Sequence, residues 1–366
     1  MKALEERIRK LEEELAVLRA ARPSAPEPAP EAPVPHLGGA GGAATQALNP
    51  DISLIGDFRG AVGRDPVRQG PGLENHELEL GLSAAVDPYS RGEVFLAFGK
   101  EGVEVEEAFL TFPALPGGFV AKVGKLRADF GKVNPRHNHT LPWTDRPLVT
   151  ENLVGGEEGI SDMGVSLSRI LPAPDSFFLE VTAQVFKGDS EGLFRATRKK
   201  DLGQVARLRG YQDLGENTNL EIGISYARGH NELGSEFLTS LRGVDATLRW
   251  KPLQRSIYTS LLWRNEFVWS RRDLLAGVAR SKGMYSSLEY RLNRRWTFGA
   301  RYDRSERAVD ASIVDRGASL LATYWMSEFS QLRGQYRSTR YGGGQDGTEF
   351  RLQLLFVMGA HGAHPF

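Results

Sequence analysis

Long runs in which apolar and polar residues alternate one by one are the feature that most constrains the fold of this chain. In one run, Leu220, Ile222 and Ile224 alternate with Glu221 and Gly223. Comparable runs occupy residues 78–86, 177–185, 244–250, 296–303 and 350–356. Successive side chains of a β-strand point to opposite faces, so each run has one apolar and one mostly polar face. The pattern therefore predicts an all-β fold of antiparallel strands.

A soluble sheet with one wet face would show the same alternation, but three features favour a membrane barrel. The runs extend over roughly 10–14 residues, whereas soluble strands are most often about 5–6 residues long. Aromatic residues lie near the ends of the runs, where membrane barrels carry girdles at the two interfaces. They are Trp250, Trp263, Trp269, Trp296, Tyr302, Tyr324, Trp325 and Tyr336.

The connections between the runs supply the third feature, because short and long ones alternate. Short turns are expected at 87–92, 113–118, 171–176, 213–217, 251–256, 292–295 and 326–330. Longer or more polar loops are expected near 188–203, 229–240, 270–282 and 304–315. An up-and-down barrel with a periplasmic and an outer side produces this alternation.

About sixteen strands can be counted in the region 50–366. They are expected near 52–64, 74–87, 91–100, 103–113, 118–127, 158–169, 175–187, 203–213, 217–228, 240–251, 257–270, 281–293, 295–305, 313–326, 330–341 and 347–358. An even number places both ends of the barrel on the periplasmic side. A barrel of this size leaves an aqueous lumen, whereas eight strands would be filled by side chains. The predicted fold is a transmembrane antiparallel up-and-down β-barrel.

Residues 1–20 are predicted to form a coiled-coil oligomerisation helix in front of the barrel. Apolar residues recur there at alternating spacings of four and three, the a/d seam of a heptad repeat. The seam consists of Leu4, Ile8, Leu11, Leu15 and Leu18. This pattern does not distinguish dimer from trimer, and a lone amphipathic helix lying on its own protein is the alternative. Residues 21–49, rich in Pro, Ala and Gly, are predicted to be a linker.

Composition and charge exclude some partners and some kinds of covalent cross-link. The chain has 46 basic and 46 acidic residues and no cysteine, which argues against a nucleic-acid binder and excludes disulfides. No secretory signal is visible at Met1. A barrel of this kind belongs in the bacterial outer membrane, in contact with its lipid, so we expect that a native signal peptide is absent from this sequence.

The longest loop of the barrel, residues 128–157, follows the fifth predicted strand, where trimeric porins carry the loop that narrows the pore. The passage from Gly124-Lys125-Leu126-Arg127 to Phe130-Gly131-Lys132 is similar to the strand-then-loop passage of the phosphate-selective porin (O/P type) family. The chain thus resembles the outer-membrane porin superfamily over roughly residues 50–358. The resemblance implies passive diffusion through a homotrimer and does not imply a preference for phosphate.

If the apolar faces meet lipid, the opposite faces line the pore together with the long loop. The candidate pore-lining and constriction residues are Lys125, Arg127, Lys132, Arg136, His137, His139, Arg146, Arg249, Arg264, Arg291, Arg301, Arg333 and Arg351. The acidic candidates include Glu77, Glu79, Glu107, Glu180, Glu221, Asp245, Glu266, Glu289 and Asp303. An arginine-rich wall facing an acidic wall would create a field across the lumen, and the arginine fork suits anions. The alternative is that these charges only pair with one another.

The sequence predicts no enzyme, no cofactor and no metal site. It contains no nucleophile elbow, phosphate loop or zinc-protease motif. His137 and His139, and the pair His361 and His364 in the Gly-rich tail, are weak indications of metal handling.

The predicted function is passive diffusion of small hydrophilic solutes, with a lean toward anions. The alternatives are a structural protein that tethers the outer membrane to the cell wall through the coiled coil, and a soluble β-rich binding protein.

Overall fold

The structure, a computed structural model, describes residues 50–68, 72–99, 102–174 and 176–359. The predicted coiled coil with Leu4, Ile8, Leu11, Leu15 and Leu18, the predicted linker and the tail histidines His361 and His364 lie outside the described residues. Within the described residues, no helix is long and apolar enough to cross a membrane.

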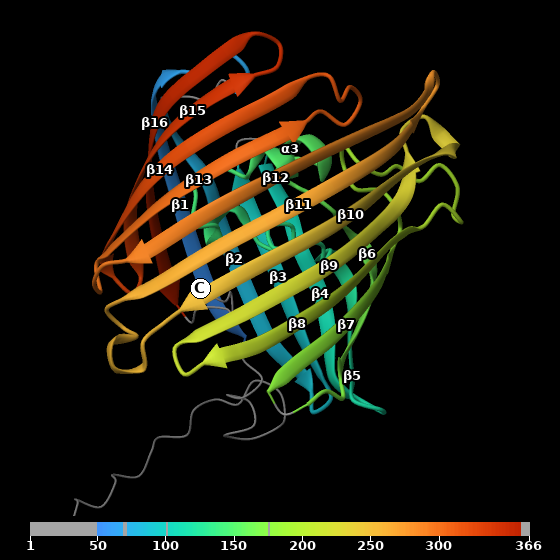
Figure 1. Ribbon diagram of the computed structural model, residues 1–366. Coiled ribbons are helices and arrows are strands. Elements are labelled where there is room, and N and C mark those ends of the chain that lie inside the picture. The colour runs from blue at the N-terminus through green and yellow to red at the C-terminus, as the bar shows by residue number, and fades with distance from the viewer. Residues whose placement is uncertain (1–49, 69–71, 100–101, 175, 360–366) are drawn as a thin grey trace, which may run out of the picture. The chain divides into compact units, whose positions relative to one another are not determined.

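In the described part of the chain, sixteen antiparallel strands form one closed barrel, as the alternation predicts (Figure 1). The strands are β1 (Asp51–Arg64), β2 (Leu73–Asp87), β3 (Ser90–Gly99), β4 (Gly102–Leu115), β5 (Phe119–Arg127), β6 (Ser161–Leu171), β7 (Phe177–Phe186), β8 (Gly203–Gly215), β9 (Thr218–Asn231), β10 (Gly234–Trp250), β11 (Ser260–Leu274), β12 (Gly277–Arg291), β13 (Trp296–Glu306), β14 (Val314–Ser327), β15 (Ser330–Tyr341) and β16 (Gln345–Gly359). Each strand pairs with its neighbours in sequence, and β1 closes the ring against β16. Ser53 lies opposite Gly359, so both ends of the barrel are on one side.

The outer face of the barrel is apolar and exposed. On β9, Ile222 and Ile224 are 46% and 56% exposed, whereas Ser225 on the opposite face is 2% exposed. Such a surface is stable only against lipid, which removes the cost of exposing apolar groups to water. Trp296 contacts Tyr324 on this face with ring centroids 4.9 Å apart, as expected of an aromatic girdle. Trp325 is an exception, because it lines a cavity inside the barrel.

The predicted short turns lie on one side of the barrel, but two of the predicted long loops are wrong. The expected loops near 229–240 and 270–282 are two-residue turns, because β9 and β10 continue to Asn231 and Gly234, and β11 and β12 continue to Leu274 and Gly277. Gly234 and Gly277 have φ angles of 120° and 133°, which favour glycine. Both segments are rich in polar residues, because strand ends beyond the lipid need no apolar outer face, and β10 also carries a register shift between Gly234 and Leu238. This composition resembles that of a loop.

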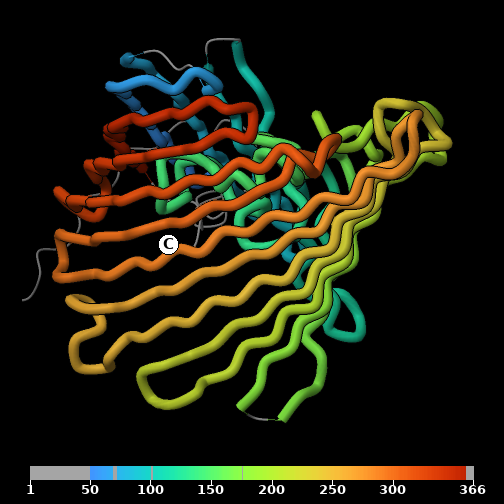
Figure 2. Tube along the Cα trace, turned by 45° about the horizontal axis from the view of Figure 1, so that its top comes forward, coloured from blue at the N-terminus to red at the C-terminus, as the bar shows by residue number. Residues whose placement is uncertain are grey.

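The long connection between β5 and β6, residues 128–160, lies inside the barrel; we call it the inserted loop. It contains η1 (Asn138–Thr140) and the helix α3 (Leu148–Leu153), and α3 contacts β11, β12, β13 and β14 (Figures 1 and 2). Its apolar side chains are 0–2% exposed: Phe130, Val133, Leu141, Trp143, Val149, Leu153 and Ile160. Each such burial contributes about 1.5–3 kcal/mol, so this loop is a packed element.

The start of the inserted loop requires a glycine. Gly131 has a φ of 61°, and a side chain there would collide with the carboxylate of Glu266 on β11. The Gly131 carbonyl accepts a hydrogen bond from the Arg207 guanidinium on β8. The chain therefore turns into the lumen immediately against the wall formed by β8 to β11.

Candidate constriction and its charged walls

Inward charges of opposite sign face the inserted loop from two parts of the barrel. The basic wall, on β10 to β16, consists of Arg249, Arg264, Arg291, Arg301, Arg333, Arg337 and Arg351. The acidic wall, on β2 and β4, consists of Glu77, Glu79, Glu106 and Glu107. Four of the predicted acidic residues, Asp245, Glu266, Glu289 and Asp303, lie on strands of the basic wall, so the separation of the two charges is only partial.

A β-bulge builds part of the acidic wall. Glu107 lies opposite Phe95, and Val105 lies opposite Leu96, which leaves Glu106 as the extra residue on β4. A bulge changes the direction of side chains locally. As a result Glu106 and the adjacent Glu107 both reach the inserted loop, although strict alternation would send only one of them inward.

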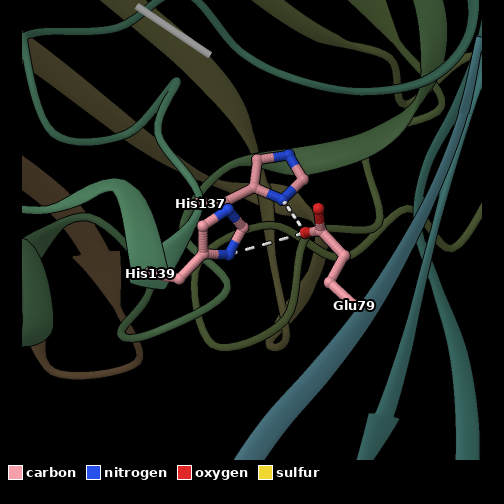
Figure 3. Close-up of side chains that lie close together, drawn as sticks. All are labelled: Glu79, His137 and His139. Carbon is pink, nitrogen blue, oxygen red and sulfur yellow. Dashed lines mark hydrogen bonds and ion pairs between the residues drawn. The ribbon is translucent and has the colours of Figure 1, made fainter. Parts of the chain in front are cut away.

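The acidic wall holds two histidines of the inserted loop. The Nδ1 atom of His137 lies 2.7 Å from a Glu79 oxygen and 2.5 Å from a Glu106 oxygen, and its Nε2 atom lies 2.7 Å from Glu107. The Nδ1 atom of His139 lies 3.4 Å from Glu77 and 3.7 Å from Glu79. Figure 3 shows both rings turned toward the same Glu79 carboxylate.

These contacts change the protonation of both rings. Burial by itself lowers the pKa of His137, but its hydrogen bonds to Glu106, Glu107 and Glu79 raise that pKa well above the ordinary value. Burial also lowers the pKa of His139, and the charges of Glu79 and Glu77 outweigh it, so the pKa is raised. Without another cation at this place, both imidazoles would carry a proton and pair with the wall.

The basic wall holds an aspartate of the same loop. Asp145 accepts bonds from Arg301 at 3.1 Å, Arg337 at 2.9 Å and Gln335 at 2.7 Å, and Arg68 approaches at 3.4 Å. Burial alone would raise the pKa of Asp145, but the charges of Arg301 and Arg337 hold it well below the ordinary value. The Asp145 carboxylate therefore remains ionised throughout the physiological pH range.

Backbone carbonyls of the loop complete this attachment. Arg333 donates to the carbonyl of Leu141 at 2.9 Å and to that of Trp143 at 3.4 Å. Arg301 donates to the carbonyl of Asp145 at 3.0 Å, and its guanidinium lies 4.9 Å from the ring of Trp143. Two of the predicted pore-lining arginines, Arg301 and Arg333, thus hold the loop in place.

Between the two walls, β8 to β11 contribute ion pairs of both signs. Lys132 pairs with Glu221 on β9, and the backbone N–H of Lys132 donates to Glu266 at 3.0 Å. Arg207 on β8 pairs with Asp245 on β10 at 3.0 Å. These charges neutralise one another, as the alternative interpretation of the inward charges expected.

A cavity of ≈ 660 Å³ separates part of the inserted loop from the basic wall. Its lining contains six basic side chains and a single acidic one, Glu289, besides His139. The basic side chains are Arg136, Arg249, Lys251, Arg264, Arg291 and Arg333. Burial, together with the nearby Arg264 charge, lowers the pKa of Arg136 from its ordinary value. The cavity is therefore strongly cationic.

Several candidate residues occupy other places than expected. Lys125 lies on the outward set, because it is opposite Met163, which is 56% exposed. Arg127 is buried at the base of the loop, where it donates to the carbonyl of Glu158 at 2.8 Å. Arg146 is 1% exposed and donates to Asn138 at 2.7 Å and to the carbonyl of Arg136 at 2.8 Å. Arg146 therefore braces the loop internally and does not line the pore.

The remaining candidates lie inside the barrel. Arg351 on β16 pairs with Glu349 at 3.1 Å.

Three residues of the site, Asp145, Glu106 and Gln335, were not identified from the sequence. The one usable signal was that Asp145 is one of only two acidic residues between Arg127 and Arg146.

Comparison with known proteins finds one curated relative and many structures of the same architecture. An uncharacterized protein of Aquifex aeolicus (strain VF5) is 31% identical in an alignment of 388 positions, which covers 88% of this chain and 81% of that protein. No protein-family model matches the chain.

Three solved structures illustrate the shared fold. OprB of Pseudomonas putida has a TM-score of 0.60 at 9% identity and covers 86% of this chain and 95% of its own. An anion-selective porin from Comamonas acidovorans has a TM-score of 0.57 at 12% identity, covering 85% and 99%. The channel DcaP of Acinetobacter baumannii has a TM-score of 0.55 at 12% identity, covering 85% and 97%. At these identities the likeness concerns the fold alone.

Proposed function

Because the chain belongs to the family of the uncharacterized Aquifex aeolicus protein and has the barrel fold of outer-membrane porins, we propose that it is a porin-like channel for small hydrophilic solutes. The fold places the chain in the bacterial outer membrane. Passage occurs by diffusion through the lumen beside the inserted loop, and no catalytic step is part of this proposal.

A preference for anions is the finer part of the proposal, and the cationic cavity carries it. Six basic side chains and one acidic side chain surround ≈ 660 Å³ between the loop and the basic wall. Rings of basic side chains favour anions in pores, and a guanidinium binds carboxylate or phosphate through two parallel donors. Arg264 is paired with Glu289, so most of the positive charge in the cavity remains available to solutes.

Planar-bilayer recording of the folded protein in a potassium chloride gradient tests both parts. We expect discrete conductance steps and a reversal potential of the sign that chloride permeation produces. Folded protein without conductance would contradict the channel, and a reversal potential of the potassium sign would contradict the anion preference alone. Adding phosphate to the chloride solution tests separately whether the cavity binds phosphate, which would reduce the chloride current; the resemblance to the phosphate-selective porins does not by itself imply such binding.

We also propose that residues 1–20 join three chains through the seam Leu4, Ile8, Leu11, Leu15 and Leu18. One solved structure of similar fold, OmpT of Vibrio cholerae, is a trimer form. Deleting residues 1–47 separates this role from a tether to the cell wall. Loss of the cross-linked trimer supports oligomerisation, whereas a retained trimer with loss of attachment to the cell envelope supports the tether.

A further inference from the structure

We propose that Glu79, His137 and His139 bind a divalent transition-metal ion, with Zn²⁺ as the best match, and that this ion joins the inserted loop to the acidic wall. The sequence alone led to the expectation of no metal site. The proposal does not depend on the transported solute, because it concerns how the loop is attached.

The donor atoms have the required chemistry and spacing. One oxygen or nitrogen from each of the three residues lies within 4.8 Å of the others. The Glu79 oxygen is 2.7 Å from Nδ1 of His137 and 3.7 Å from Nδ1 of His139 (Figure 3). A tetrahedral zinc ion with ligands at about 2.0–2.1 Å holds them roughly 3.3 Å apart. The Glu79 oxygen and Nδ1 of His137 would have to separate by about 0.6 Å, and the Glu79 oxygen and Nδ1 of His139 to approach by about 0.4 Å, to reach ligand spacing.

Two carboxylate oxygens face a single nitrogen of His137, and this arrangement suits a bound metal ion better than a single N–H hydrogen bond. Its Nδ1 atom faces oxygens of Glu79 at 2.7 Å and of Glu106 at 2.5 Å. One N–H group cannot donate a straight hydrogen bond to two carboxylates at once. A metal ion between these three atoms would satisfy all of them, and Glu106 would then complete the ligand set.

The outer contacts have the form that metal-bound histidines usually show. The other ring nitrogen of His137, Nε2, lies 2.7 Å from a Glu107 oxygen. A carboxylate that accepts this hydrogen bond fixes the ring and the tautomer in which Nδ1 carries the lone pair toward the metal. Glu77, 3.4 Å from Nδ1 of His139, offers a further oxygen. Phe95 packs edge-on against His137 with ring centroids 5.2 Å apart.

The burial and the charge of the cluster are compatible with a bound divalent ion, and the donor atoms favour a transition metal. Glu79, His137 and His139 are 0%, 1% and 4% exposed. The acidic wall brings four carboxylates together, and Arg127 approaches one of them, Glu106, at 3.4 Å. A divalent ion with two neutral imidazoles supplies the same +2 charge as two protonated imidazoles. Imidazole nitrogens select Zn²⁺ and its neighbours over Mg²⁺ and Ca²⁺, which prefer oxygen ligands.

The test uses the full-length folded protein in detergent, stripped with chelator and titrated with Zn²⁺ by calorimetry. We expect one ion per barrel. The double variant His137→Gln/His139→Gln should weaken binding by at least about 100-fold, because two ligands are lost. The matched control is His230→Gln, a histidine beside Asp201 at 3.8 Å and outside the cluster; it should leave binding unchanged. His361→Gln/His364→Gln removes the tail histidines as an alternative source of binding.

The double variant could fail to fold, so a second variant, Glu107→Gln, keeps all three ligands and removes only the outer contact of His137. It should weaken Zn²⁺ binding by about 10–100-fold. Co²⁺ in place of Zn²⁺ should give visible absorption bands, which the double variant loses. The proposal is overturned if the folded protein binds no Zn²⁺, or if binding survives in the double variant and disappears with the tail histidines.

Discussion

The two charged walls attach to the same loop in opposite ways. At the basic wall, Arg301 and Arg337 surround one loop carboxylate, Asp145, and positive charge is left over around a cavity. At the acidic wall, four glutamates surround His137 and His139 in a site that is almost closed to solvent. The loop thus presents basic groups to the acidic wall, whereas it presents the acidic Asp145 and, across the cavity, the basic Arg136 to the basic wall. The acidic wall therefore serves only to attach the loop, whereas the basic wall both attaches the loop and faces solutes.

The largest expected effect comes from removing the acidic anchor of the basic wall. Asp145→Ala removes the carboxylate that Arg301 and Arg337 share. Arg301 keeps Asp303 at 2.7 Å, and Arg337 keeps Asp65 at 2.7 Å and Glu349 at 2.9 Å. The loss is therefore smaller than that of a fully uncompensated buried charge, at about 1.5–3 kcal/mol. We expect a lower free energy of unfolding by that amount and a larger single-channel conductance, because the loop loosens. Asp189→Asn, at an exposed pair with Lys187, is the control. Unchanged stability and conductance in Asp145→Ala would show that the basic wall does not hold the loop.

Acid should break the attachment of the inserted loop to the basic wall only at low pH. The pKa of Asp145 is lowered on folding, so its stabilisation is complete above the unfolded value of about 3.9 and disappears as the pH falls through the lower folded value. We expect the conductance of the wild-type protein to stay constant down to about pH 4 and to rise only below it. Asp145→Asn should abolish this acid transition; the same transition in that variant would assign it to another carboxylate.

The surplus charge of the basic wall should control selectivity with little effect on stability. Arg249 and Arg291 line the cavity. A charge about 8 Å from a passing ion in water contributes about 0.5 kcal/mol. Two such charges attract chloride and repel potassium by about 1 kcal/mol each, so Arg249→Gln/Arg291→Gln should reduce the chloride-to-potassium permeability ratio by up to about 30-fold at low salt, and less at high salt, measured from the reversal potential. An unchanged ratio would place the selectivity elsewhere.

The smallest effect is expected at Lys125, which lies on the outward set and pairs with Glu104 at 3.3 Å. Exposed pairs contribute about 0–1 kcal/mol. Lys125→Gln should leave the reversal potential unchanged and serves as the matched control for the cavity arginines. A shift comparable with theirs would mean that this lysine does face the lumen.

Most of the barrel could be predicted from the sequence, because lipid on one side and water on the other impose alternation on every strand. The sixteen strands and the position of the long loop after the fifth strand follow from this pattern. The candidate site could be predicted only in part. Alternation gives the face of Arg301 and Arg333. Lys125 was assigned to the pore because it precedes the long loop, whereas alternation along β5 places it on the outward face of Val123, which is 44% exposed.

By itself, the sequence determined which residues form strands and which of their faces meets lipid, because both depend on neighbours one or two positions away. Only the tertiary structure decided the partners across the lumen. Asp145 meets Arg337 although 192 positions separate them, and His137 meets Glu79 across 58. The bulge that brings Glu106 to His137 also depends on the pairing of β3 with β4. Such contacts form when a closed ring confines a folded loop, and no local pattern specifies which wall each loop residue will reach.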